Sequence, residues 1–301
     1  MVDRPFLGIL LMLGFCILAP LGDSMAKLLG DSLSVGFLVM VRFAVQAILL
    51  LPLVWMFKYP MPKGARLIRL TAIRTVLHIC GIGLMFTSLQ YLDLADAIAI
   101  AFVMPFIMLL LGKFYLGEEV GPHRLAACAV GFIGTLLVVQ PNFAEVGAPA
   151  LLPMGVAVVF ALFMLVTRQI AKDVDPIGLQ ALSGVMAVPV MAVALLAFPQ
   201  STLLFVAPVS GADWVLLAVL GGLGTIAHLL MTWSLRFAPS ATLAPMQYLE
   251  IPFGTIIGYL IFRDLPNGLA ALGICITIAA GLYIVLRERA TARRLAATPA
   301  P

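Results

Sequence analysis

Met85–Tyr91 reads MFTSLQY and Met231–Phe237 reads MTWSLRF, and these two stretches decide the fold. They lie 146 residues apart, and a serine and a leucine coincide at their fourth and fifth positions. The same offset places Glu118 on Asp264 without a gap. The second half of the chain therefore repeats the first.

The composition indicates what kind of unit is repeated. The chain is 63% hydrophobic, has a mean hydropathy of +1.13 and contains 11% charged residues, whereas soluble domains average about 25% charged residues. Apolar stretches recur along the whole sequence at the length that a membrane-spanning helix needs, about 20 residues. They are continuous rather than alternating, which favours helices over a transmembrane barrel. The expected spans are 6–29, 33–56, 68–90, 94–112, 124–140, 150–168, 176–198, 213–235, 241–262 and 268–286.

These spans predict an all-α integral membrane protein of ten transmembrane helices. The first five form a repeat over residues 6–140 and the last five a second repeat over 150–286, followed by a basic tail, 287–301. Within one residue of the same offset, Ala26-Lys27 lies over Ala171-Lys172. Because five is an odd number of spans, the second repeat enters the bilayer in the opposite direction. Many secondary transporters are built from such inverted repeats, with the solute site at the midplane between them.

The positions of lysine and arginine predict the orientation, because cytoplasmic segments carry the excess of these residues. With the N-terminus in the cytoplasm, 14 of the 18 fall in inward segments, one, Arg263, in an outward segment, and three within spans. The sequence therefore predicts a multi-pass protein of a bacterial-type inner membrane with both termini cytoplasmic. The inward residues are Arg4, Lys58, Lys63, Arg66, Arg69, Lys113, Arg124, Arg168, Lys172, Arg236, Arg287, Arg289, Arg293 and Arg294.

Several functions are disfavoured by what the sequence holds. The net charge of +4 follows from this topology and does not indicate nucleic-acid binding. The cysteines all fall within spans and form no CxxC pair, and the three histidines have no metal-ligand spacing, so we expect no disulfide frame, no metal and no cofactor. No phosphate loop of the form GxxxxGK[ST] occurs, which disfavours ATP-driven transport. The cysteines are Cys16, Cys80, Cys128 and Cys275, and the histidines are His78, His123 and His228.

Charged residues inside spans are costly and are therefore the first candidates for a functional site. Asp23 and Lys27 are four residues apart on one face of span 1, where they serve either the solute or a local ion pair. Arg42 lies deep in span 2 without a partner in its own span, and so needs a carboxylate from another helix or an anionic ligand. Arg74 and His78 share a face of span 3; Arg74 binds solute or extends its guanidinium to lipid phosphates. His78 serves the site or is a hydrogen-bonded core residue.

The second half holds the remaining candidates. Glu250 is its only acid deep in a span, and Gln247 and Gly254 fall on the same helical stripe. His228 in span 8 is either a site residue or a core histidine. Trp233 and Tyr248 could stack on a planar solute, although aromatic residues in spans more often serve packing. Pro20, Pro105, Pro245 and Pro252 lie in spans 1, 4 and 9, where a missing N–H can bend or loosen a helix.

The ordered set of motifs resembles the EamA-type branch of the drug/metabolite transporter superfamily, over about residues 6–286. The first copy reads YLGEE over Tyr115–Glu119 and the second reads FRDLP over Phe262–Pro266, each followed by a glycine-rich last span. Asp264 stands where the family usually has glutamate. The resemblance implies a ten-helix carrier with a central cavity, whose solute differs between members: amino acids, nucleoside-type metabolites, vitamins such as riboflavin, S-adenosylmethionine or drugs.

The sequence therefore predicts a secondary transporter for a small organic metabolite, working by alternating access and acting as a monomer or homodimer in the lipid bilayer. Import and export stay open. Protons are the expected coupling ion because Glu250 and Asp23 are titratable. An integral-membrane enzyme or a non-transporting membrane partner is the alternative, but no reactive constellation of residues supports an enzyme.

Overall fold

The structure is a computed structural model that describes residues 4–118, 120–139, 147–263 and 268–297. Within these residues every regular element is helical. Asp264 and Glu119, which carry part of the expected repeat motif, lie outside the described residues. The helices are α1 (Pro5–Leu29), α2 (Val35–Phe57), α3 (Ala65–Ser88), α4 (Leu94–Ala101), α5 (Met104–Leu116), α6 (Pro122–Val139), the short 3-10 helix η1 (Ala148–Leu151), α8 (Leu152–Ile170), α9 (Pro176–Ala197), α10 (Gly211–Phe237), α11 (Ser240–Gln247), α12 (Glu250–Phe262) and α13 (Gly268–Ala297).

Seven segments of the described chain are long and apolar enough to cross a bilayer. They are α1, α2, α3, α4 with α5, α8, α9 and α10, and each coincides with an expected span. The apolar stretches Glu250–Phe262 and Ala271–Tyr283 are shorter. The structure thus supports an all-helical multi-pass membrane protein, while the count of ten spans stays a prediction. The helix α13 continues into the basic tail as far as Ala297.

Two expected spans are broken in the middle, and proline explains both breaks. The span 94–112 divides into α4 and α5 just before Pro105, and the span 241–262 divides into α11 and α12 just before Pro252. A proline has no N–H to bond to the carbonyl four residues earlier, so the helical ladder is interrupted there. By contrast, α1 runs unbroken across Pro20.

The broken helices obey the same offset as the sequence. α11 begins and ends 146 residues after α4, and α12 begins and ends 146 residues after α5. Phe102 and Tyr248, the equivalent residues at the two breaks, lie against each other with ring centroids 5.8 Å apart. Two equivalent positions can meet in this way only if they lie close to the axis that would relate the two halves.

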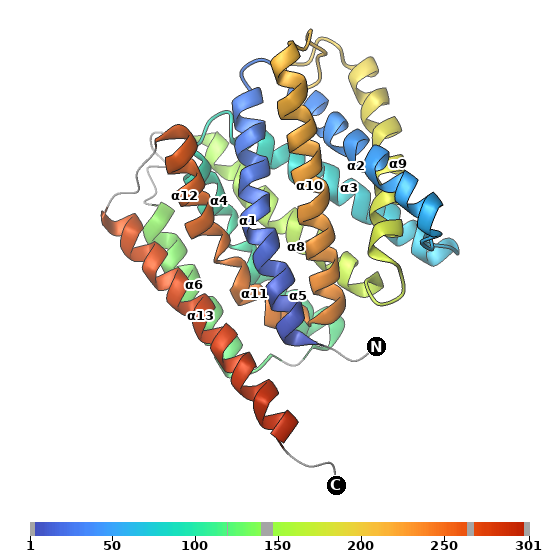
Figure 1. The fold of residues 1–301 in the computed structure, drawn as a ribbon. Coiled ribbons are helices and arrows are strands. Elements are labelled where there is room, and N and C mark those ends of the chain that lie inside the picture. The colour runs from blue at the N-terminus through green and yellow to red at the C-terminus, as the bar shows by residue number, and fades with distance from the viewer. Residues whose placement is uncertain (1–3, 119, 140–146, 264–267, 298–301) are drawn as a thin grey trace.

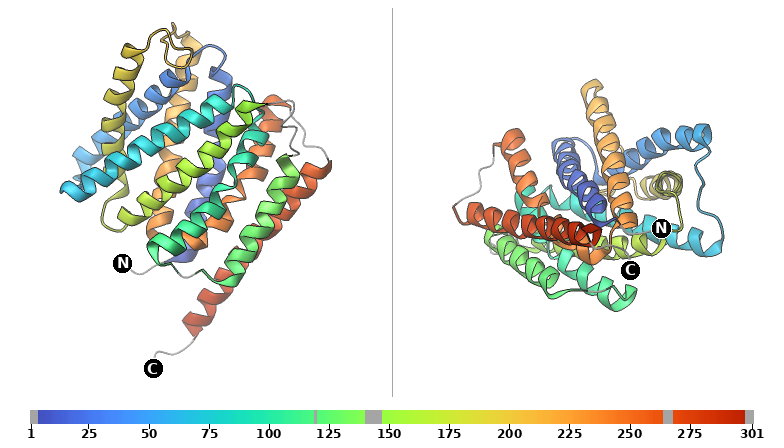
Figure 2. Two further views of the ribbon diagram at one scale, coloured as in Figure 1. Left: turned by 180° about the vertical axis from the view of Figure 1, so that it is seen from behind. Right: turned by 60° about the horizontal axis from the view of Figure 1, so that its bottom comes forward.

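The helices of the first half pack against helices of the second half in matching pairs. α1 packs against α10 and α8 against α3, while α2 packs against α9 and α6 against α13. Figures 1 and 2 show α6 and α13 side by side along one flank of the bundle. The crossing of α6 and α13 is close because Gly134 faces the backbone of α13 at Gly273.

α1 begins and α13 ends at the same end of the bundle (Figure 1). We call this the proximal end, and we call the opposite end, where α1 ends and α10 begins, the distal end. Arg4 N donates to Phe237 O at the proximal end, which places the end of α10 there too. At the distal end, the loop before α10 bonds to α2, since Gly36 N donates to Leu203 O.

Candidate functional site

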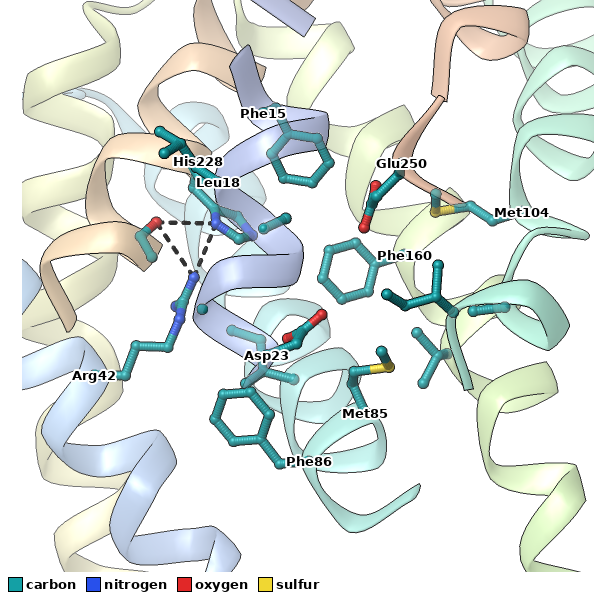
Figure 3. Close-up of a pocket in the computed structure, with 18 of the residues that line it drawn as sticks. Phe15, Leu18, Asp23, Arg42, Met85, Phe86, Met104, Phe160, His228 and Glu250 are labelled. Carbon is teal, nitrogen blue, oxygen red and sulfur yellow. Dashed lines mark hydrogen bonds between the residues drawn. The ribbon is translucent and has the colours of Figure 1, made fainter. Parts of the chain in front are cut away.

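A cavity lies inside the bundle (Figure 3). Its lining comes from the distal parts of α1, α2, α3, α8 and α10, together with α4 and the residues that begin α5 and α12. The lining residues are Phe15, Leu18, Ala19, Gly22, Asp23, Arg42, Ile82, Met85, Phe86, Ile98, Ala101, Phe102, Met104, Val156, Phe160, Leu220, Gly224, Ala227, His228 and Glu250.

Most of this lining is apolar and aromatic. The rings of Phe15, Phe86 and Phe160 border the space, and the thioethers of Met85 and Met104 lie beside it (Figure 3). Phe160 can reach its position because it lies over Gly81, where an added Cβ would be 2.6 Å from the ring. Aromatic walls of this kind suit a planar solute that stacks.

Two acidic side chains point into the cavity, Asp23 from α1 and Glu250 from the first residue of α12 (Figure 3). Glu250 is only 8% exposed. Within the described part of the chain, neither carboxyl group has a hydrogen-bond or ion-pair partner. Buried polar groups normally have a partner, so these two acids are available to water, a proton or a solute.

Arg42 is held at the opposite wall by α10. Its Nη2 donates to His228 Nδ1 at 2.8 Å and contacts Gly224 O at 3.4 Å (Figure 3). His228 Nδ1 also lies 3.0 Å from Gly224 O, so Arg42, His228 and this carbonyl oxygen form a triangle of polar contacts (Figure 3). Arg42 Nη1 and His228 Nε2 have no partner among the described residues. Sequence reasoning expected a carboxylate or an anion on Arg42, but within the described chain no acid lies within ion-pair distance of it.

A second polar cluster lies behind this wall, toward the proximal end. Arg74 is fully buried; its Nε donates to Thr167 Oγ1 at 2.9 Å and its Nη1 to Ser183 Oγ at 3.0 Å. The alternative that Arg74 extends to lipid phosphates is therefore wrong. His78 stacks on His228 with ring centroids 4.3 Å apart, and neither of its nitrogens has a partner among the described residues. Within the described residues, His78 is therefore not the hydrogen-bonded core histidine that was one of its two alternatives.

Other expectations for site residues need correction. Lys27 pairs with Asp93 at 3.0 Å, near the distal end, so the local pair with Asp23 does not form. Gln247 ends α11 whereas Glu250 begins α12, so the break between them removes the shared stripe; the amide of Gln247 contacts Met164 Sδ instead.

The two aromatic candidates of the second half do not line the cavity. Trp233 packs in a separate apolar cluster with Leu50. Tyr248 is buried against Phe102 at the helix break. Stacking surfaces are supplied instead by the phenylalanines of α1, α3 and α8, which polarity could not single out in a chain this apolar.

The proximal end of the bundle is tied together by a charged pair that sequence reasoning did not identify. Arg168 Nε donates to Glu118 Oε1 at 3.1 Å, and each side chain is 10% exposed. Ser240 N donates to the same carboxylate oxygen at 3.2 Å, and Arg168 Nη1 donates to Leu235 O. The pair thus joins α5 to α8 and to the chain at the junction of α10 and α11.

No group of three or more potential metal ligands occurs within the described residues. The two carboxyl groups, the arginine and the histidine of the cavity come from four different helices. The arrangement can recognise and hold a polar solute.

Comparisons with known proteins give this geometry a context. The sequence profile of the EamA-like transporter family matches residues 6–140 and 148–287. A riboflavin transporter from Brucella anthropi is 26% identical over 257 residues, which cover 84% of this chain and 88% of that protein. A riboflavin transporter from Rhizobium johnstonii is 30% identical, covering 73% of this chain and 71% of the relative.

Another relative has a different solute in its name. An S-adenosylmethionine uptake transporter from Rickettsia felis is 26% identical and covers 89% of this chain and 88% of the relative. A solved crystal structure superposes with a TM-score of 0.73 at 18% identity and covers 94% of this chain and 97% of that chain, which shows a shared fold.

Proposed function

Because the chain belongs to the EamA-like transporter family, we propose that it is a secondary carrier that moves a small, planar organic metabolite across the membrane by alternating access. The family match and the named relatives make it a multi-pass membrane transporter of small metabolites and not an enzyme. The proposal adds alternating access as the mechanism, a planar metabolite as the solute and an orientation in the membrane.

One observation carries the mechanism: the cavity and the charged pair lie at opposite ends of the bundle. The cavity is lined by distal segments of its helices, whereas Glu118 and Arg168 join helices at the proximal end. A carrier that exposes its site to one side at a time needs a closed end opposite the open one. A largely buried ion pair that bridges the two halves is suited to hold that end closed.

The helix bounds support two inverted repeats, over residues 6–140 and 150–286. α4 and α5 recur as α11 and α12 at an offset of 146 residues, with the same break between them. The exchange of packing partners supports the same relation, because each packing of α1 with α10 is matched by one of α8 with α3. An axis in the membrane plane would turn one half into the other.

The basic residues at the proximal end support an orientation of the protein in the membrane. Arg66, Arg69, Arg124 and Arg236 lie in the segments of α3, α6 and α10 that approach this end. The excess of basic residues supports an orientation in which this end faces the cytoplasm from a bacterial-type inner membrane. Both termini are then cytoplasmic, and the cavity in this structure faces the opposite side.

The cavity supports a planar solute. Rings of Phe15, Phe86 and Phe160 offer faces for stacking, and Asp23 and Glu250 offer acceptors for hydrogen bonds in its wall. Riboflavin and S-adenosylmethionine, the solutes in the names of the relatives, both contain a planar heteroaromatic ring. They are the first solutes to test on this chain.

The experiment uses purified protein in sealed vesicles with radiolabelled riboflavin or S-adenosylmethionine. We expect saturable uptake of at least one of them without nucleotide, and acceleration by the unlabelled solute inside, which marks exchange. Protein with Glu250→Gln is the variant, and Gly222→Ala, on an open helix face, is the matched control. A requirement for nucleotide rejects a secondary carrier, and the absence of uptake and exchange for both solutes rejects the proposed solute class.

A further inference from the structure

Each residue that lines the distal cavity has a counterpart in the other proposed repeat. The offset is 146 residues for α3 with α10 and for α4–α5 with α11–α12, and 145 for α1 with α8. It is 141 for α2 with α9, whose first turns are capped in the same way by Ser34 and Asp175. The mapping rests on the proposed repeats and can be checked against contacts that did not enter it.

Three pairs of equivalent residues have both members in the cavity wall. They are Phe15 with Phe160, Ile82 with His228, and Met104 with Glu250. A pair can line one space in this way only near the axis, where Phe102 also meets its own counterpart. This central part of the site is therefore common to both orientations of the carrier.

Five of the other lining residues have polar counterparts on the proximal side, and four of these counterparts contact one another. Leu220, Gly22, Arg42, Phe86 and Gly224 correspond in turn to Arg74, Thr167, Ser183, Thr232 and His78.

Arg74 lies at the centre of this second set. It donates to Thr167 at 2.9 Å and to Ser183 at 3.0 Å, and its Nη2 lies 3.5 Å from Thr232 Oγ1. All four side chains are buried to at least 99%. The counterparts of a cavity wall thus form one collapsed polar cluster.

This cluster carries more polarity than its own contacts satisfy. Arg74 has no acid within ion-pair distance among the described residues. Both nitrogens of His78 and the Oε1 of Gln247 are buried without a partner there. Gln247 is the counterpart of the lining residue Ala101. A buried guanidinium without an anion is costly in a membrane protein, and a state that admits water and solute to the cluster would remove that cost.

We infer that the solute meets a second lining, centred on Arg74, when the proximal end opens, and that this lining binds an anionic group such as a carboxylate. The inference rests on the proposed alternating access. In this structure the site is closed by the packing of α3, α8, α9 and α10 around Arg74. The distal lining adds Asp23 and Arg42 to the central part of the site. The proximal lining adds the guanidinium of Arg74, the hydroxyl groups of its three hydroxyl-bearing neighbours and the imidazole of His78.

The first experiment tests whether the second lining opens. Met231 is fully buried and is the counterpart of the cavity residue Met85. Each is replaced by cysteine in a background in which the four native cysteines are alanine, and labelling by a hydrophilic maleimide is timed in detergent. In the Glu118→Gln background, the maleimide should label Met231→Cys about tenfold faster and Met85→Cys more slowly. The reason is that the substitution removes a charge-assisted hydrogen bond from the state in which the proximal end is closed.

The labelling result can overturn the inference in two ways. If Met231→Cys stays unlabelled in the Glu118→Gln protein while Met85→Cys is labelled, no second lining opens. If both cysteines label faster together, the substitution has loosened the fold and the pair does not separate two states. Transport measured on the same proteins separates these failures from failure of the carrier itself, because a working carrier with an inaccessible Met231 position refutes only this inference.

The second experiment tests the chemistry of the site in the Glu118→Gln protein. Indole-3-propionate and tryptamine share a ring and differ in the charge of the side chain. The acid should slow labelling of Met231→Cys, and the amine should not. Arg74→Gln should abolish the protection, Arg74→Lys should keep part of it, and Arg69→Gln, an exposed arginine on the same helix, should leave it unchanged.

Equal protection by acid and amine, or protection that survives Arg74→Gln, refutes an anion site at Arg74. The rate of Met85→Cys labelling in each Arg74 variant reports whether the protein is folded, because that position lies in the distal cavity, whose lining does not include Arg74. If the protein keeps Arg74 and is folded, but indole-3-propionate does not slow the labelling of Met231→Cys, the assignment of the ligand class is likewise overturned.

Discussion

Gly224 is the position at which one added methyl group tests the cavity wall. A Cβ there would lie 2.5 Å from Arg42 Nε and 2.9 Å from Cζ, whereas ordinary contacts begin near 3.4 Å. The guanidinium of Arg42 must therefore retreat by about 1 Å, because the backbone of α10 cannot move without disturbing its packing on α1.

The size of the effect follows from the contacts that are lost. The 2.8 Å bond from Arg42 Nη2 to His228 Nδ1 leaves the hydrogen-bonding range after such a shift. A hydrogen bond to a charged group contributes about 1.5–3 kcal/mol, and alanine in place of glycine returns about 1 kcal/mol within a helix. We therefore expect Gly224→Ala to lower the free energy of unfolding by about 0.5–2 kcal/mol, which is roughly a 2- to 30-fold change in the ratio of folded to unfolded protein.

The assay measures unfolding in detergent and solute exchange in vesicles on the same preparations. Gly222→Ala is the control, because it lies on the same helix two residues away and an added Cβ there meets nothing within 4 Å. It should be slightly more stable than the parent and exchange solute at the parent rate. If Gly224→Ala matches Gly222→Ala in both measurements, Arg42 does not occupy this wall and the reasoning is refuted.

Three further predictions concern the site, the topology and the coupling. Glu250→Gln and Arg42→Ala should each reduce transport while expression and membrane insertion stay near normal; parental transport in both variants would remove the proposed site. Reporter fusions at residue 62 and at the C-terminus should report the cytoplasm and a fusion at residue 205 the other side, and a C-terminus outside would reject the orientation. Uptake should be driven by a proton gradient, and uptake that persists with equal pH on both sides and no membrane potential would reject obligatory proton coupling.

The sequence predicted the class of fold because the information is spread over the whole chain. Seven expected spans coincide with helices that can cross a bilayer. The breaks at Phe102 and Tyr248 were not predicted, although Pro105 and Pro252 were noted as sources of flexibility. Proline lowers the stability of a helix locally, but whether it bends, breaks or merely kinks the helix depends on neighbours that only the packing supplies.

The site was predictable where its residues are charged and obscure where they are apolar. Asp23, Arg42, His228 and Glu250 line the cavity, and each was a candidate because polarity is rare inside spans. Phe160 gave no signal, since phenylalanine is the usual content of a membrane helix.

Partner choice was the other obstacle to prediction. Helical spacing offered Asp23 as one possible partner of Lys27, whereas in the structure Lys27 pairs with Asp93, the residue before α4. Spacing along one helix indicates which residues share a face, and it contains no information on which other segment approaches that face.

Met104 and Glu250 occupy equivalent places at the start of α5 and α12, and both border the cavity. One copy thus contributes a thioether and the other an ionisable acid, so the two orientations of such a carrier are not energetic mirror images. Half-saturation concentrations for influx and efflux would then differ, and the carrier would dwell longer on one side of the bilayer. A single carboxyl group without a counterpart near the axis would be enough to give influx and efflux different rates.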